Sequence, residues 1–270
     1  MSPADEPIPD WAIPAATLIV MRNGHPAPEI LMVVRSKAMR FVGGMAVFPG
    51  GRVEEQDYTL ADTVSDIYDY PRECIVSRIA AIRETLEETG LLVGVRGELS
   101  APAIATAREQ MCAGREFGEV LSENGWHLDL DQLHWMARWR PPIRDISHLF
   151  DTRFYIATVG TGAIALEADG SESRDVFWAT AKQVLADGEA GKLALIGPTR
   201  ANLLRLAQSD TFETAKAQIA EFPPRYVLPH VDLSGDRPWV GVPEGHGYPE
   251  VRFIKDGGGV VEALEKNNDP

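Results

Sequence analysis

The segment from Arg72 to Thr89 constrains the fold more than any other part of the sequence. Apolar residues recur in it every three or four positions, at Ile75, Ile79, Ile82 and Leu86. This spacing is typical of a helix with one apolar face. Gly90 follows the segment directly and predicts the end of the helix. The sequence therefore predicts a helix over residues 72–89 with one face buried in the core.

The opposite face of this helix carries three carboxylates. At about 100° per residue, Glu84, Glu87 and Glu88 fall within an arc of about 100°. Like charges at this spacing repel one another, and a solvated acidic face is the ordinary interpretation. Three converging carboxylates are also a site for a hard divalent cation, which prefers oxygen ligands and can bridge to phosphate oxygens. The spacing alone leaves both interpretations open.

The same residues resemble the signature of the Nudix family, Gly-x5-Glu-x7-Arg-Glu-U-x-Glu-Glu-x-Gly-U, where U is apolar. Gly51 and the run Arg83-Glu84-x-x-Glu87-Glu88-x-Gly90-Leu91 match it. The resemblance implies a Mg²⁺ (or Mn²⁺) cofactor. It also implies catalytic roles for Arg83, Glu84, Glu87 and Glu88, with the three glutamates as metal ligands and Arg83 paired with a carboxylate. Glu172, ahead of Trp178, is a candidate additional metal ligand or base, and an exposed loop carboxylate is the alternative.

Two departures from the signature stand out. Gly51 and Arg83 are 32 positions apart, where the signature has 14, so about 18 residues are inserted. Ile75 stands eight positions before Arg83, where the signature has glutamate, and Glu54 and Glu73 are weak candidates to replace it. Residues 54–72 are acidic and are interpreted as a surface loop inserted without moving the carboxylate helix.

The residues before the glycine pair Gly50-Gly51 indicate a class of substrate. The run Arg35-Ser36-x3-Arg40-x3-Gly44-x3-Phe48-Pro49-Gly50-Gly51 resembles the pattern of coenzyme A-hydrolysing Nudix enzymes. Arginines can pair bidentately with phosphate groups, and glycines let the backbone approach a ligand. Surface charge is the alternative role for the two arginines. The predicted substrate-binding residues are Arg35, Arg40, Gly44, Gly50 and Gly51.

The remaining elements follow from periodicity and turn residues. Strands are expected at 14–22 and 29–35 (joined as a hairpin), and at 91–95, 133–139 and 153–159; helices are expected within 102–124, at 178–187 and within 197–220. The resemblance implies an α/β fold, the Nudix α/β/α sandwich with a mixed sheet. Residues 10–195 are the expected Nudix hydrolase domain. Residues 196–270 are the expected C-terminal helical extension, with a tail rich in Pro and Gly that is a candidate for homodimer contacts.

Charge and composition exclude several functions. The formal net charge of −14 argues against binding to nucleic acid or to an anionic membrane. No apolar run approaches the roughly 20 residues of a membrane helix, and the first ten residues do not resemble a signal peptide. A cytoplasmic location is the expectation. The two cysteines, Cys74 and Cys112, cannot form a disulfide framework.

The expected function is therefore Mg²⁺-dependent hydrolysis of a diphosphate bond in coenzyme A or acyl-CoA, a small-molecule nucleotide substrate. The products would be 3′,5′-ADP and phosphopantetheine or its acyl form. One alternative keeps the catalytic helix but takes ADP-ribose or another nucleoside diphosphate derivative. A second alternative, of a different class, is a Nudix domain that senses a ligand without turnover, which the loss of a glutamate at Ile75 favours.

Overall fold

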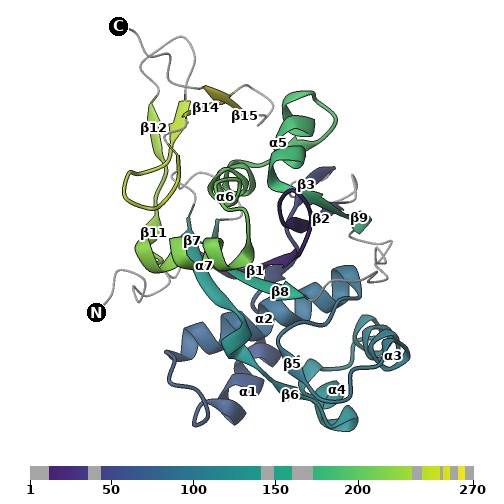
Figure 1. The fold of residues 1–270 in the computed structure, drawn as a ribbon. Coiled ribbons are helices and arrows are strands. Elements are labelled where there is room, and N and C mark those ends of the chain that lie inside the picture. Colours follow the sequence, from purple (N-terminus) through teal and green to yellow (C-terminus); the bar gives the residue numbers. More distant parts are fainter. Residues whose placement is uncertain are drawn as a thin grey trace, which may run out of the picture.

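The computed structural model describes residues 12–35, 44–140, 149–159, 173–232, 239–249, 252–255 and 261–264. Within these ranges a mixed sheet lies between two layers of helices (Figure 1). Its strands are β1 (Ile13–Arg22), β2 (Glu29–Arg35), β3 (Met45–Val47), β4 (Gly50–Arg52), β7 (His134–Trp139), β8 (Phe150–Val159), β9 (Ser173–Thr180), β10 (Ala194–Leu195) and β11 (Tyr226–Val227). The α/β/α sandwich predicted from the sequence is confirmed.

The helices divide between the two faces of the sheet. One layer contains α1 (Glu55–Val64), α2 (Arg72–Thr89), α3 (Ala101–Cys112) and α4 (Phe117–Asn124), with the short 3₁₀ helix η2 (Leu130–Gln132). The other contains α5 (Ala181–Glu189), α6 (Gly197–Leu206) and α7 (Phe212–Glu221). Two smaller sheets flank them: β5 (Val95–Arg96) with β6 (His127–Leu128), and β12 (His230–Asp232), β13 (Trp239–Gly241), β14 (Arg252–Lys255) and β15 (Val261–Leu264).

Strand β1 is the centre of the main sheet. It runs parallel to β8 along its whole length, from the pair Ile13–Phe150 to the pair Arg22–Val159. It is antiparallel to β2 on its other side, and the short strand β4 also pairs with it in the antiparallel sense. Pairs of both senses make the sheet mixed, and the β1–β4 pairing fixes the glycine pair of β4 beside the centre of the sheet.

Alternation along β1 builds a core on each face. Leu18 and Val20 point into the cluster beneath α2, whereas Ile19 and Met21 point into the cluster beneath α5 and α6, and all four are buried. Burying a side chain of this size contributes about 1.5–3 kcal/mol. A strand with apolar residues on both faces is therefore stable only between two helical layers.

Most predicted elements are confirmed, including the hairpin of β1 and β2, helix α2 with its end at Gly90, and the strands β7 and β8. Two predictions are wrong. Only the last residue of the strand predicted at 91–95 lies in a strand, β5. The helix predicted to begin at 178 begins at Ala181, because the chain to Thr180 pairs with β2 as β9. The apolar and β-branched residues before Thr180 favour that pairing.

The prediction of a surface loop at residues 54–72 is also wrong. Residues 55–64 form helix α1, in which Asp57 and Ala61 are buried. Helix α1 packs against α2, and its N-terminal turn lies beside the glycine pair of β4. Residues 54–72 are thus partly built into the core, and they reach the carboxylate helix directly.

In the described part of the chain, no helix combines the length and the apolar character needed to cross a membrane.

Candidate active site

The carboxylate helix α2 lies across β1 and β4, with its apolar face on the sheet. Ile75, Ile79, Ile82 and Leu86 are all buried, as the sequence predicts. Gly90 ends the helix in the left-handed conformation at φ 73°, and its N–H donates to the carbonyl of Leu86. Glycine adopts this conformation without a steric cost. The apolar face fixes the rotation of the helix and places its glutamates beside β4.

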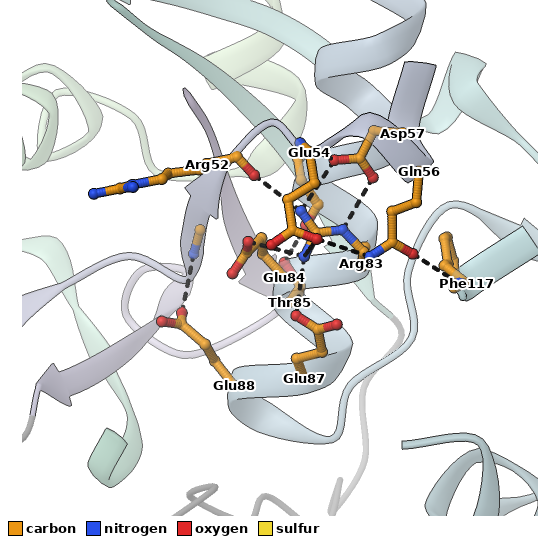
Figure 2. A network of polar contacts seen from close by, with 12 residues as sticks. Arg52, Glu54, Gln56, Asp57, Arg83, Glu84, Thr85, Glu87, Glu88 and Phe117 are labelled. Atoms are coloured by element: carbon orange, nitrogen blue, oxygen red, sulfur yellow. Dashed lines mark hydrogen bonds and ion pairs between the residues drawn. The ribbon is translucent and has the colours of Figure 1, made fainter. Parts of the chain in front are cut away.

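The glycine pair of β4 contacts two of the three glutamates. The backbone N–H of Gly50 donates to Glu88 Oε2 at 3.0 Å (Figure 2). The carboxylate of Glu84 lies against Gly51 in the space that a Cβ would otherwise fill. Both glycines belong to the predicted substrate-binding set, and the structure places them in direct contact with predicted metal ligands.

Arg83 donates hydrogen bonds to both Glu84 and Glu87 and so holds these two carboxylates together. Its Nη1 donates to Glu84 Oε1 and to Glu87 Oε2, each at 3.0 Å. Its Nη2 also donates to the carbonyl oxygen of Arg52 at 2.9 Å. The Arg83 side chain is only 2% exposed. These contacts pair Arg83 with carboxylates, which is the pairing that the family resemblance implies, and they connect the turn after β4 to the helix.

Asp57 completes the contacts of Arg83 and is the residue that the sequence analysis missed. Arg83 Nε donates to Asp57 Oδ1 at 2.9 Å and Nη2 donates to Asp57 Oδ2 at 3.0 Å. With the bonds to Glu84, Glu87 and Arg52, all five N–H groups of the guanidinium have acceptors. The contacts draw the cluster into one network (Figure 2).

Counting forward would have identified Asp57 from the sequence. It stands six positions after Gly51, where the Nudix signature has its first glutamate. Counting back from Arg83 leads to Ile75 instead, because the insertion falls after Asp57. Of the two replacements considered, Glu54 lies 3.9 Å from Arg83 Nη1, while Glu73 lies in the first turn of α2, far along the helix from Arg83.

Burial and mutual repulsion disfavour the charged forms of these glutamates. Burial raises the pKa of Glu84 to about 8; Arg83 opposes the rise, while Glu88 and Glu87 add to it. Burial also raises the pKa of Glu87, with Arg83 again opposing and Glu54 adding. A divalent cation among the carboxylates would relieve both the repulsion and the loss of hydration.

The donor set fits a hard divalent cation. Glu84, Glu87 and Glu88 offer carboxylate oxygens on one face of one helix, the ligands that Mg²⁺ and Mn²⁺ prefer. As the side chains stand, no three His, Cys, Asp or Glu residues within the described ranges converge closely enough to form a finished metal site. The reason is visible in the contacts: Arg83 holds Glu84 and Glu87, while the Gly50 N–H holds Glu88. Rotation of the glutamate side chains would be needed to bring their oxygens together.

Arg35 and Gly44, two other predicted substrate-binding residues, lie within the described part of the chain. Arg35, the last residue of β2, places Nη1 3.5 Å from Glu88 Oε1. Gly44 has φ 78° and donates its N–H to the carbonyl of Arg35 at 3.0 Å. Arg40, predicted to bind substrate, and Glu172, predicted as an extra metal ligand, lie outside the described residues.

Three aromatic residues of β7 and β8 differ in burial. Trp139 and Phe154 are buried in the cluster beneath α6 and are core residues. Trp135 is half-buried on the face of α2, and the guanidinium carbon of Arg153 lies 5.8 Å from its ring centroid.

Comparison with known proteins identifies relatives of the chain. No family model matches the chain. "Putative nudix hydrolase 7" of Caenorhabditis elegans is 29% identical over 201 residues, which cover 73% of this chain and 61% of that protein. "Acyl-coenzyme A diphosphatase NUDT19" of Gallus gallus is 24% identical over 229 residues, which cover 66% of this chain and 61% of that protein. The chain thus spans less than two thirds of the length of these two curated relatives.

A solved structure agrees with the sequence relatives. The crystal structure of a NUDIX hydrolase from Alicyclobacillus acidocaldarius superposes with a TM-score of 0.66 at 29% sequence identity, covering 76% of this chain and 96% of that one. The fold and the sequence relatives therefore point to the same family as the Arg-Glu-x-x-Glu-Glu helix beside its glycine pair. The sequence relatives, the superposed structure and the carboxylate helix together support assignment of the chain to the Nudix hydrolase family.

Proposed function

We propose that the chain hydrolyses the diphosphate bond of coenzyme A or acyl-CoA with Mg²⁺ or Mn²⁺ as cofactor. The observation that carries the proposal is the placement of Glu84, Glu87 and Glu88 on one helix face against the glycine pair of β4, with Arg35 beside Glu88. Carboxylates for a cation and an arginine for a phosphate thus lie side by side. This is the combination that attack of water on a diphosphate requires.

The proposed role of each residue follows from its contacts. When a divalent cation is bound, it supplies charge neutralisation at the diphosphate and lowers the pKa of an attacking water. Glu84, Glu87 and Glu88 would hold that cation, and one of them would accept the proton of the water. Arg83 keeps Glu84 and Glu87 together, because its own position is fixed by Asp57 and the Arg52 carbonyl. Arg35 would pair with a phosphate of the substrate.

The choice of coenzyme A rests on two further supports. The run from Arg35 to Gly51 resembles the pattern of coenzyme A-hydrolysing Nudix enzymes at each fixed position. One curated relative carries the name acyl-coenzyme A diphosphatase, at 24% identity. The net charge of −14 is compatible with an anionic substrate if the cation and the arginines neutralise it locally.

The test is a substrate panel. Purified protein with Mg²⁺ is incubated separately with CoA, acetyl-CoA, a longer acyl-CoA, ADP-ribose and diadenosine polyphosphates, and products are separated by chromatography. We expect cleavage of the CoA compounds to 3′,5′-ADP and the phosphopantetheine product. The Glu87→Gln variant should lower the rate by about 100-fold or more, as expected for removal of a group that acts at the reacting centre.

The other outcomes of the panel separate the alternatives. Cleavage of ADP-ribose alone would retain the hydrolase and exclude coenzyme A as substrate. Binding of a nucleotide without turnover in the presence of Mg²⁺ would support the ligand-sensing module. Arg40→Gln adds a finer test, because it should slow hydrolysis of CoA more than that of the other substrates.

A further inference from the structure

The contact between Arg35 and Glu88 joins a predicted phosphate-binding residue to a predicted metal ligand. Arg35 Nη1 lies 3.5 Å from Glu88 Oε1, while Glu88 Oε2 accepts the N–H of Gly50. The Glu88 side chain is 4% exposed and the Arg35 side chain 15% exposed. A carboxylate so little exposed is stabilised by a nearby cation, and Arg35 supplies one.

Arg35 and Arg83 hold their glutamates in different ways. Arg83 is fixed by a bidentate pair with Asp57 and by the Arg52 carbonyl, and its bonds to Glu84 and Glu87 are 3.0 Å long. The Arg35 contact with Glu88 is longer than the roughly 2.7–2.9 Å of a charge-assisted hydrogen bond. The Arg35 contact therefore costs less to break, and Arg35 stands at the end of its strand rather than beneath the cluster.

We propose that Arg35 is an exchangeable counter-cation of Glu88. In the protein without metal it neutralises Glu88, and when a divalent cation takes Glu88 it turns to the phosphate of the substrate. The proposal rests on the proposed function and deepens it, because it makes metal binding the event that releases the phosphate-binding arginine. Arg35 then competes with the cation for Glu88 in the metal-free protein and binds the substrate phosphate in the metal-bound protein.

This exchange predicts effects of opposite sign on two binding constants. Removing the Arg35 charge takes away a competitor for Glu88, so a divalent cation should bind more tightly. It also removes a phosphate partner, so a diphosphate ligand should bind more weakly to the metal-loaded protein. A merely structural Arg35 would weaken both on substitution, and an Arg35 that only binds substrate would leave metal affinity unchanged.

Arg52 provides the matched control for charge. Removing any nearby positive charge favours cation binding through long-range electrostatics, and this effect must be separated from the loss of the Glu88 contact. Arg52 follows Gly51 directly, and its exposed side chain extends away from the carboxylates (Figure 2). Its guanidinium carbon lies 5.6 Å from the centroid of the Phe150 ring. Arg52→Gln thus removes the same charge near the site without touching Glu88.

The experiment is a titration of Mn²⁺ alone, followed by calorimetry or electron paramagnetic resonance, with no nucleotide present. We expect Arg35→Gln, and Arg35→Met as a second neutral variant, to bind Mn²⁺ about three- to tenfold more tightly than wild type, the gain expected from loss of one partly buried ion pair. Arg35→Lys keeps the charge, and Arg35→Lys and Arg52→Gln should stay within about twofold of wild type. Melting temperatures measured in parallel show that each variant is folded.

A second titration measures the substrate side. α,β-Methylene-ADP, which carries a non-hydrolysable diphosphate, is added to the Mn²⁺-saturated proteins, and Arg35→Gln should bind it more weakly than wild type or Arg52→Gln. Equal or weaker Mn²⁺ binding by both neutral Arg35 variants would overturn the exchange while leaving the hydrolase proposal intact. No Mn²⁺ binding by the wild-type protein would overturn both.

Discussion

Asp57 of α1 and Arg83 of α2 form a buried bidentate ion pair, with Nε–Oδ1 2.9 Å and Nη2–Oδ2 3.0 Å. The pair joins α1 to the carboxylate helix, and both side chains are 2% exposed or less. Because Arg83 in turn holds Glu84 and Glu87, α1 supports the candidate active site.

Replacing Asp57 should therefore be costly. Asp57→Asn leaves the buried guanidinium of Arg83 without its main counter-charge, and the free energy of unfolding should fall by about 3–5 kcal/mol. Urea denaturation measures the change. The control is Asp62→Asn, which removes the carboxylate of an exposed pair with Arg72 and should leave the unfolding midpoint unchanged. Equal effects of the two substitutions would contradict the bracing role of Asp57.

The two glycines of β4 should respond differently to alanine. A methyl group at Gly51 would overlap the Glu84 carboxylate, the far end of a flexible side chain, so the fold should survive while that carboxylate is displaced. We expect Gly51→Ala to lower the rate of hydrolysis by about 10- to 100-fold, since small misplacements of reacting groups are costly, with little change in unfolding midpoint.

Gly50→Ala is the matched comparison. Gly50 has φ +152°, and a methyl group there would overlap the backbone of Ala16 and Thr17. Backbone cannot rotate aside, so the substitution should lower the free energy of unfolding by about 1–3 kcal/mol. Thermal and urea unfolding of the two alanine variants distinguish the cases; a larger stability loss at Gly51 than at Gly50 would contradict the geometry.

Asp129 should contribute stability that depends on pH. Its carboxylate accepts from Arg96 Nε and Nη2 at 2.6 and 2.7 Å and from Gln132 Nε2 at 2.7 Å. The hydrogen bonds from Arg96 hold the pKa of Asp129 below its usual value. A lowered native pKa means that the folded state favours the charged carboxylate, so the contribution is complete above the unfolded pKa of about 3.9 and is lost as pH falls through the native pKa.

Unfolding of wild type and Asp129→Asn measured from pH 7 to pH 2 tests this. The wild type should be more stable by about 1 kcal/mol at pH 7, because Arg96 is largely exposed. The difference should shrink only below about pH 4. A difference that stays constant down to pH 2 would show that the charge of Asp129 is not responsible.

The hydroxyl of Tyr226 in β11 should contribute to the stability of the fold. Its hydroxyl donates to Asp151, which also accepts both Nε and Nη2 of Arg138, and the Arg138–Asp151 pair is fully buried. Tyr226→Phe leaves the buried carboxylate one donor short, so the free energy of unfolding should fall by about 1–2 kcal/mol.

Tyr70→Phe is the control for the loss of a hydroxyl. Tyr70 donates to Asp131 at 2.8 Å in an exposed position where water can replace it. Its loss should change the free energy of unfolding by no more than about 0.5 kcal/mol. Chemical denaturation of both variants gives the comparison, and equal losses would argue that the bond at Asp151 has no special weight.

The sequence by itself determined the helix that carries the chemistry and the sheet beneath it. The apolar spacing from Ile75 to Leu86 and the glycine at position 90 are local signals, and they act through the period of the helix and the conformational freedom of one residue. The strands β1 and β2 with their hairpin are local in the same sense, because turn residues between two apolar runs predict the pairing.

Tertiary structure decided what the glutamates and arginines contact. Asp57 contacts Arg83 across 26 positions of the chain because α1 folds back on α2. The apolar spacing within either helix does not predict this contact. The helix predicted at 178 gave way to β9, since pairing with β2 outweighed a weak helical pattern. Arg35 reaches Glu88 only through the stacking of α2 on the sheet. Local spacing sets which side chains share a face, whereas burial and the pairing of distant strands and helices set which faces meet.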